Sequence, residues 1–197
     1  MKTILFLCCL ILLTVSNVFS QQRDRGTFEV IPTIGFAGSD LYGSEVDQLI
    51  YRYGFRTGVL GDYYFNDRWS LRSGLTYFSM GADENFGVEL KLDYLNIPIN
   101  ANWHFGSTRK WNLNFGITPG FLVSADAEGE DIKEMFTSFQ LAFSFGIGYK
   151  LEITKSFSLL IDYQRFFGIT DIANDTEMSS IRNNADSINL GAVFAFK

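Results

Sequence analysis

The chain has 197 residues, of which 47% are hydrophobic, 16% aromatic and 19% charged. That length suits one domain, and 20 phenylalanines against 3 prolines exclude an intrinsically disordered chain, because so much apolar surface can be buried. A net charge of −6 argues against nucleic acid as a partner, since phosphate binding needs clustered Lys and Arg. The unusual feature is that bulky Phe and tiny Gly, at 20 and 18 residues, are both abundant.

The first 20 residues predict a cleaved secretory signal peptide. Lys2 precedes an apolar run over residues 4–13, and the polar and small residues that follow lead to a cleavage site before Gln21. A membrane-spanning helix would need about 20 apolar residues, roughly twice the length of this run. We therefore expect an exported protein whose mature part, residues 21–197, is one domain.

Both cysteines, Cys8 and Cys9, fall inside the predicted signal peptide. The mature chain then contains no cysteine, which excludes a disulfide framework and a thiolate metal site. We expect neither a cofactor nor a metal ion.

Large apolar residues alternate with polar or small residues along nearly the whole mature chain. In residues 137–150 the odd positions from 139 onward carry large apolar side chains, and nearly all the even positions carry Ser, Gln, Ala or Gly. Because successive side chains of a strand point to opposite faces, this pattern predicts a strand with one apolar face. Eight such segments predict eight strands: 27–37, 52–65, 69–80, 88–105, 111–123, 137–150, 157–168 and 187–196.

The fourth of these segments changes phase near Tyr94. Leu90 and Leu92 have even numbers, whereas the apolar residues Leu95, Ile97 and Ile99 have odd numbers. We expect either a β-bulge there or an upper part of the strand that projects beyond the apolar layer.

The connections between the predicted strands alternate in length. Short links at 66–68, 106–110 and 151–156 alternate with long polar links at 39–50, 81–87, 125–135 and 169–184. Short and long connections must then gather at opposite ends of the sheet. Tight turns at one end and longer loops at the other are typical of an antiparallel up-and-down transmembrane β-barrel.

Residue size indicates which face of this barrel points outward. The interior of an eight-stranded barrel is just wide enough for side chains to fill, which suits Gly, Ser, Ala and Asn better than rows of Phe and Leu. The apolar face should therefore contact lipid, and the small and polar face should line the lumen.

The outward aromatic residues near the short-turn end predict an interfacial girdle. Nearly every strand places one at that level, and all three tryptophans belong to the set, whereas the core of a soluble barrel would require no common height. The set is Phe28, Tyr63, Phe65, Trp69, Trp103, Phe105, Trp111, Tyr149, Phe157, Phe194 and Phe196.

The inward face carries four charged residues, Arg56, Asp62, Arg72 and Asp162. Pairing the strands across the tight turn at 66–68 places Asp62 directly opposite Arg72, where opposite charges attract. We expect this pair to form a hydrogen-bonded plug with Asn112, Asn114, Gln140 and Gln164. A proton or ion path is the functional alternative, but structural pairing of buried charge is the more common case.

His104, the single histidine, has the parity of an inward residue near the short-turn end. A catalytic histidine of a lipid-modifying barrel would instead lie near the outer leaflet with a serine or carboxylate partner. Ser107 is close in sequence but belongs to the turn, so a packed or solvated histidine is expected.

Three further motifs have simpler explanations than ligand binding. Gly146–Gly148 is a GxG without a third glycine or a following helix, so it does not indicate a nucleotide site. The acidic group Asp126, Glu128, Glu130 and Asp131 lacks the calcium-loop spacing and is expected to be a solvated external loop that could attract a divalent cation. The sequon at 174–176 is uninformative in a bacterial protein.

Three blocks of sequence resemble the outer-membrane β-barrel family often called porin-family proteins. They are RYGFRTGVLGDYYF at 52–65, WSLRSGL at 69–75 and LDYLNIPI at 92–99, with Tyr94 and Pro98 as the most recognisable positions. Residues 116–120 and 145–149 fit its later strands, whereas the final Phe196–Lys197 departs from the aromatic residue with which such barrels commonly end. The resemblance implies an eight-stranded barrel in a Gram-negative outer membrane and implies no particular activity.

We therefore expect an all-β, monomeric, non-enzymatic outer-membrane barrel whose external loops bind or shield, with a lumen too filled for a general porin. Its expected partners are outer-membrane lipid, the barrel assembly machinery during insertion and an unidentified loop ligand. The sequence identifies no catalytic, cofactor, metal or ligand-binding residue. The alternatives are a lipid-modifying barrel enzyme and a secreted lipocalin-like carrier.

Overall fold

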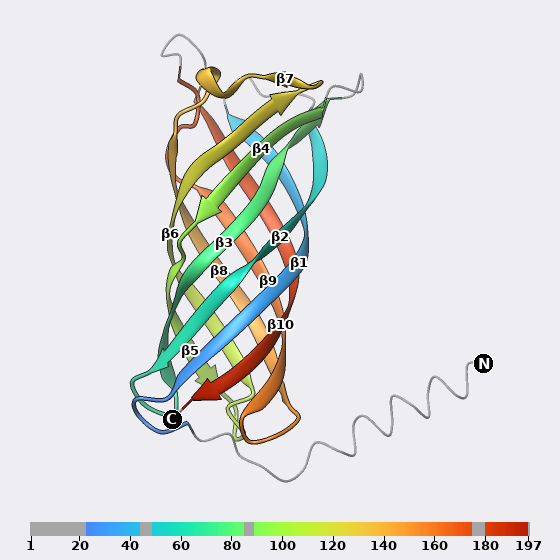
Figure 1. Cartoon of the computed structure of the whole chain (residues 1–197). Coiled ribbons are helices and arrows are strands. Elements are labelled where there is room, and N and C mark those ends of the chain that lie inside the picture. Colours follow the sequence, from blue (N-terminus) through green and yellow to red (C-terminus); the bar gives the residue numbers. More distant parts are fainter. Residues whose placement is uncertain (1–22, 44–48, 85–88, 175–179, 197) are drawn as a thin grey trace, which may run out of the picture.

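The computed structural model describes residues 23–43, 49–84, 89–174 and 180–196. Its strands close into one antiparallel ring whose strands tilt around a common axis (Figure 1). The strands are β1 (Phe28–Gly43), β2 (Leu49–Tyr64), β3 (Trp69–Glu84), β4 (Glu89–Asn96), β5 (Ile99–Phe105), β6 (Trp111–Ala127), β7 (Glu130–Asp131), β8 (Phe139–Glu152), β9 (Phe157–Gly168) and β10 (Ile181–Phe196).

The wall of the barrel contains eight strand positions, as the alternation predicts. β1 pairs with β2 and β10, and the ring continues through β3, β6, β8 and β9. β4 and β5 occupy one position between β3 and β6 and are separated by Ile97 and Pro98, where proline cannot donate to the ladder. β7 forms only a short hairpin with the top of β6.

Of the two explanations predicted for the phase change near Tyr94, the structure supports the second, because the outward residues of the upper part of β4 are the polar Glu89, Lys91 and Asp93. Leu92, Tyr94 and Asn96 are all buried, so β4 keeps its even residues inward throughout. The register shift lies opposite Asp93 and Tyr94, where β6 contains the extra residue Val123. The apolar residues change face because the upper lumen is itself apolar.

The strands extend further toward the long-loop end than the hydropathy pattern predicts. β1 continues to Gly43, β3 continues to Glu84, and β10 begins at Ile181. Part of the segments predicted as long loops at 39–50, 81–87 and 169–184 is therefore strand. These strand ends do not show the outward apolar rows on which the sequence prediction relied.

The two faces of the wall have the predicted orientation. Large apolar side chains such as Ile34, Phe115 and Ile161 are exposed on the outside, while Ser, Asn and charged residues are buried inside. The predicted girdle lies outward, with successive ring contacts Trp69–Trp103, Trp103–Phe105, Phe105–Trp111 and Trp111–Tyr149 at centroid distances of 6.3, 5.1, 6.3 and 4.9 Å.

The only helical segment in the described part of the chain is a 3-10 turn at Lys133–Met135. None of the helices found among the described residues has the length and hydropathy needed to cross a membrane. The predicted signal peptide, residues 1–20, lies outside the described residues, as does most of the sequon at 174–176.

Candidate functional site: the lumen and its external cap

The predicted Asp62–Arg72 pair forms inside the half of the barrel nearer the short turns, which we call the lower lumen; the half nearer the long loops is the upper lumen. The two residues face each other across β2 and β3. Arg72 donates from Nε to Asp62 Oδ1 at 2.8 Å and from Nη2 to Oδ2 at 3.0 Å, a bidentate geometry. Asn102 Nδ2 donates to Asp62 Oδ2 at 3.1 Å. Both partners of the pair are fully enclosed.

Lys150 and Glu29 extend this pair into a network that the sequence analysis missed. Lys150 Nζ donates to Asp62 Oδ2 at 3.2 Å, to Tyr64 Oη at 2.9 Å and to Glu29 Oε2. Arg23 Nε donates to the other Glu29 oxygen at 2.7 Å. The alternation itself could have placed Lys150 inside, because its even number gives it the inward parity of this strand, whereas Tyr149 has the outward parity.

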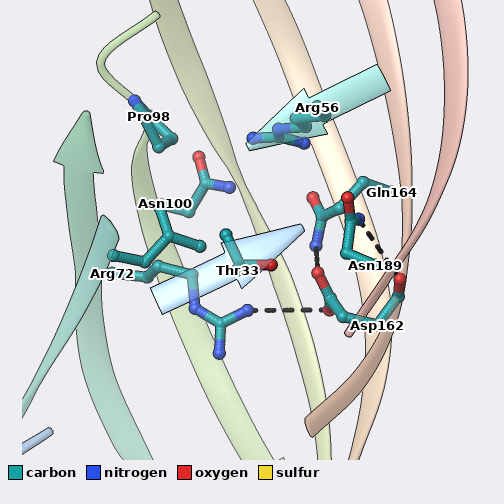
Figure 2. A pocket seen from close by; sticks show the side chains of 9 residues that line it. Thr33, Arg56, Arg72, Pro98, Asn100, Asp162, Gln164 and Asn189 are labelled. Carbon is teal, nitrogen blue, oxygen red and sulfur yellow. Dashed lines mark hydrogen bonds and ion pairs between the residues drawn. The ribbon is translucent and has the colours of Figure 1, made fainter. Parts of the chain in front are cut away.

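Asp162 joins the network from β9, above the Asp62–Arg72 pair. Its Oδ1 lies 3.6 Å from Arg72 Nη1, and its Oδ2 accepts from Gln164 Nε2 at 2.7 Å. Figure 2 shows Arg72, Asp162 and Gln164 around a small cavity, with Arg56 also lining it. The cavity has a volume of about 10 Å³. A space of that size holds about one water molecule.

The four amides predicted to complete the plug behave differently from one another. Asn114 Oδ1 accepts from Asn100 at 3.0 Å, Gln140 Oε1 accepts from Asn183 at 2.8 Å, and Gln164 bonds to Asp162. Only Gln164 is therefore joined to the charged network, through Asp162. Within the described residues Asn112 has no hydrogen-bond partner for its side-chain amide, so the predicted plug is wrong for Asn112, Asn114 and Gln140. The neighbours of Asn112 across the sheet are Gly148, which has no side chain, and His104.

His104 is buried near the short-turn end and is packed, as predicted. Its ring stacks on Tyr64 at 4.7 Å, and Nε2 lies 2.9 Å from Ser70 Oγ. Ser70 was not predicted as its partner, although the pairing of β3 with β5 makes the two strands neighbours. Both side chains are enclosed by the barrel, so a lipid substrate has no access to the pair.

The upper lumen is filled by apolar side chains, which corrects the prediction of a polar interior throughout. The cluster is Ala37, Leu41, Phe78, Met80, Ala82, Leu92, Tyr94, Leu122, Ala125, Ala142, Phe166, Ile172 and Ala185. The rings of Phe78 and Phe166 meet edge to face at 6.0 Å. The cluster also contains several alanines, and because their side chains are small, two phenylalanines fit inside a barrel this narrow.

Two external segments cover this apolar cluster. Ile172 is completely buried against it, and Ile132 and Phe136 pack partly buried beside it. Backbone bonds join the segments: Thr137 N donates to Ile172 O at 2.9 Å, and Asn174 N donates to Met135 O at 2.9 Å. We call residues 132–137 and 169–174 the external cap.

Asp171 links the external cap to the start of β10 by hydrogen bonds. Its Oδ1 accepts from the backbone N–H groups of Ala173 and Ile181, both at 3.0 Å. Burial raises the pKa of Asp171, but these backbone donors outweigh it and hold the pKa below the usual value. The carboxylate therefore stays charged at neutral pH and keeps both hydrogen bonds.

The acidic residues at 126–131 lie on the β6–β7 hairpin, exposed or half-buried, as expected for a solvated loop. Asp126 Oδ1 accepts from Gly129 N at 3.1 Å, which closes the turn. Among the described residues, no three His, Cys, Asp or Glu side chains are arranged to hold a metal ion.

Comparison with known proteins places this architecture among membrane barrels. A family model described as outer membrane protein beta-barrel domain matches residues 19–174. No curated protein matches the sequence.

Three solved structures share the fold at low sequence identity. Neisserial surface protein A is 18% identical with a TM-score of 0.54, covering 87% of this chain and 99% of that one. OprG from Pseudomonas aeruginosa is 12% identical with a TM-score of 0.53, covering 89% and 98%. AlkL, determined in lipid bilayers, is 12% identical with a TM-score of 0.52, covering 92% and 93%.

Proposed function

Because the chain belongs to the outer membrane protein β-barrel domain family, we propose that it is a closed anchor in the bacterial outer membrane whose external loops make its contacts. The barrel holds the loops at the surface and conducts no general flow of solutes. No chemistry is performed in the lumen.

The buried charge network is the observation that carries this proposal. Arg72, Lys150, Asp62 and Glu29 contact one another across the lower lumen, and the internal cavity above them has a volume of about 10 Å³. A hydrated ion needs a continuous water path, and this cavity holds about one water molecule. The apolar cluster and the external cap close the upper end.

The outer side of the external cap supports the role in contacts. Met135 is 58% exposed, and Glu128, Glu130 and Glu134, which are near it in the sequence, are exposed as well. An external segment that exposes carboxylates and an apolar side chain is suited to a protein or peptide partner with basic residues.

The two alternative functions lack this kind of support. A lipid-modifying enzyme needs a reactive pair open to the outer leaflet, whereas Ser70 and His104 are buried at the opposite end. A lipocalin-like carrier needs apolar residues around an internal cavity, whereas Phe115, Ile117 and Phe143 point outward.

Single-channel recording in planar bilayers tests the closed lumen. We expect the folded full-length mature protein to give no steady openings of porin size, while a general porin inserted in the same way gives them. Band migration that changes on heating would establish that the recorded sample is folded. Steady porin-sized openings from such a sample would contradict the proposal.

A further inference from the structure

One row of residues on the outside of the barrel carries an ion pair where a lipid-facing wall is normally apolar. The row crosses four neighbouring strands, from Tyr53 on β2 through Gly38 on β1 and Asp186 on β10 to Arg165 on β9. Arg165 Nη1 donates to Asp186 Oδ2, and about a fifth to a quarter of each side chain is exposed. An exposed charge on the lipid side is costly in mid-membrane, so its height on the wall matters.

The height of the pair places it near the outer surface of the membrane. Arg165 and Asp186 are each eight residues from the girdle residues Phe157 and Phe194 on the same strands. At about 3.3 Å per residue and a tilt near 40°, eight residues rise roughly 20 Å, which approaches the far edge of an apolar band about 25 Å tall. The pair therefore lies within about 5 Å of the outer edge of the apolar band, within reach of the outer-leaflet headgroups.

The neighbouring outward residues agree with this height. Toward the girdle the wall presents Ile188, Leu190 and Ile161, all exposed. In the opposite direction β1 and β10 present Asp40 and Arg182. The ion pair thus lies where the outward residues of β1 and β10 change from apolar to polar, while the chain along β9 stays apolar beyond it, with exposed Phe167 and, just after the strand, Ile169.

A hollow of about 410 Å³ opens beside the ion pair. Gly38 forms part of its lining, and a Cβ atom added there would lie 3.0 Å from the ring of Tyr51. Tyr53, which is 66% exposed, stacks on Phe36 at a centroid distance of 5.5 Å. Because Gly38 has no side chain, the ring of Tyr51 can lie against the backbone at the edge of the hollow.

The polar groups around the hollow can recognise both a phosphate and sugar hydroxyls. Asp186 accepts from Tyr163 Oη and lies 3.4 Å from Tyr51 Oη. Arg165 borders the hollow through Tyr51 and Asp186, to which its Nη1 donates, and its guanidinium lies over the ring of Phe167 at 4.8 Å. Among the described residues its Nε and Nη2 have no hydrogen-bond partner. Guanidinium N–H groups bind phosphate in pairs, and a carboxylate accepts hydrogen bonds from hydroxyls.

We propose that this tyrosine-lined hollow binds the phosphorylated sugar headgroup of an outer-leaflet glycolipid. Arg165 contacts the phosphate, the sugar ring lies against Tyr53 and Tyr51, and the acyl chains follow Ile188 and Leu190 toward the membrane interior. Tyrosine suits this position because one end of its side chain is apolar and the other polar.

Lipid titrations of the folded mature protein in detergent micelles test this site. Native mass spectrometry would count the lipid retained when diphosphorylated lipid A, dephosphorylated lipid A or phosphatidylglycerol is added. Arg165→Gln removes the phosphate contact, and Gly38→Leu displaces the Tyr51 ring into the hollow while keeping both charges. Lys91→Gln is the matched control, because Lys91 lies on β4, four positions around the ring from β10, with its side chain 45% exposed.

We expect wild-type protein and Lys91→Gln to retain diphosphorylated lipid A equally, and Arg165→Gln and Gly38→Leu to bind it about ten-fold more weakly. Dephosphorylated lipid A and phosphatidylglycerol should each bind the wild-type protein more weakly than the diphosphorylated form. Heat-modifiable migration would confirm that each variant is folded.

Two results would overturn the proposal. Equal retention of phosphatidylglycerol and lipid A would mean that the wall attracts any anionic lipid and does not read the sugar. Unchanged lipid A binding in folded Arg165→Gln or Gly38→Leu would mean that the lipid coats the barrel without using this hollow.

Discussion

Lys150 is the residue on which the lower lumen depends most, because its Nζ contacts Glu29, Asp62 and Tyr64 together. Replacing it in Lys150→Met keeps much of the volume but leaves two buried carboxylates with one cation fewer. Breaking a buried ion pair in this way costs roughly 3–5 kcal/mol. We expect the midpoint of urea unfolding in lipid vesicles to fall accordingly.

Lys155→Met is the control for this substitution, since Lys155 is exposed in the short turn between β8 and β9. It removes the same charge from the same end of the molecule, and its unfolding midpoint should match that of the wild-type protein. If both variants lose the same stability, the effect comes from net charge and the network is not responsible.

The contacts of Lys150 also show how far residue-level prediction reaches. Asp62 and Arg72 sit on adjacent strands joined by a tight turn, so the turn length alone fixes their pairing. Lys150 on β8 meets Glu29 on β1 across the lumen, and these strands are not neighbours in the sheet. Whether these two side chains can meet depends on how the ring closes and how far its strands are staggered, and the alternation of residues does not specify either.

At the scale of elements, the most deeply buried side chain of the external cap is that of Ile172. Ile172 lies completely inside the apolar cluster, although it belongs to no strand. Ile172→Ser places a hydroxyl there and empties part of the site, at a cost of about 3 kcal/mol. We expect the cap to loosen, so that trypsin added to intact membranes cleaves the protein faster after Lys133.

Met135→Ser provides the comparison, because Met135 belongs to the same cap and is exposed. Its cleavage rate should equal that of the wild-type protein. A cap that loosens equally in both variants would show that the loops are not held by Ile172.

The upper parts of the strands were the elements that sequence patterns described least well. Alternation has meaning where one face meets lipid, and it predicted the strands there with the correct orientation. In the upper parts of the strands, the inward side chains are apolar and many of the outward side chains are polar, so the alternation no longer identifies the lipid-facing side. Leu92 and Tyr94 therefore looked like a change of phase, although β4 keeps its inward positions unchanged.

For the whole molecule, the aromatic girdle fixes how deep the barrel sits in the membrane. Rings from successive strands contact one another around the short-turn end, and another contact joins Phe157 to Phe194 at 5.3 Å. A soluble protein gains nothing from aligning these rings at one height on its outside, whereas a membrane interface does stabilise them. The abundance of Phe beside Gly follows from the same division into a lipid face and a packed interior.

This placement predicts how lipids quench the fluorescence of Trp69, Trp103 and Trp111, which make up all 3 tryptophans of the sequence. In vesicles, lipids brominated near the headgroup should quench strongly, and lipids brominated at the ends of the acyl chains should quench weakly, because the rings lie at the interface. Stronger quenching by the deep bromines would mean that the girdle lies at mid-membrane, contrary to this placement. No quenching by either lipid would mean that the tryptophans of the barrel wall do not contact lipid at all.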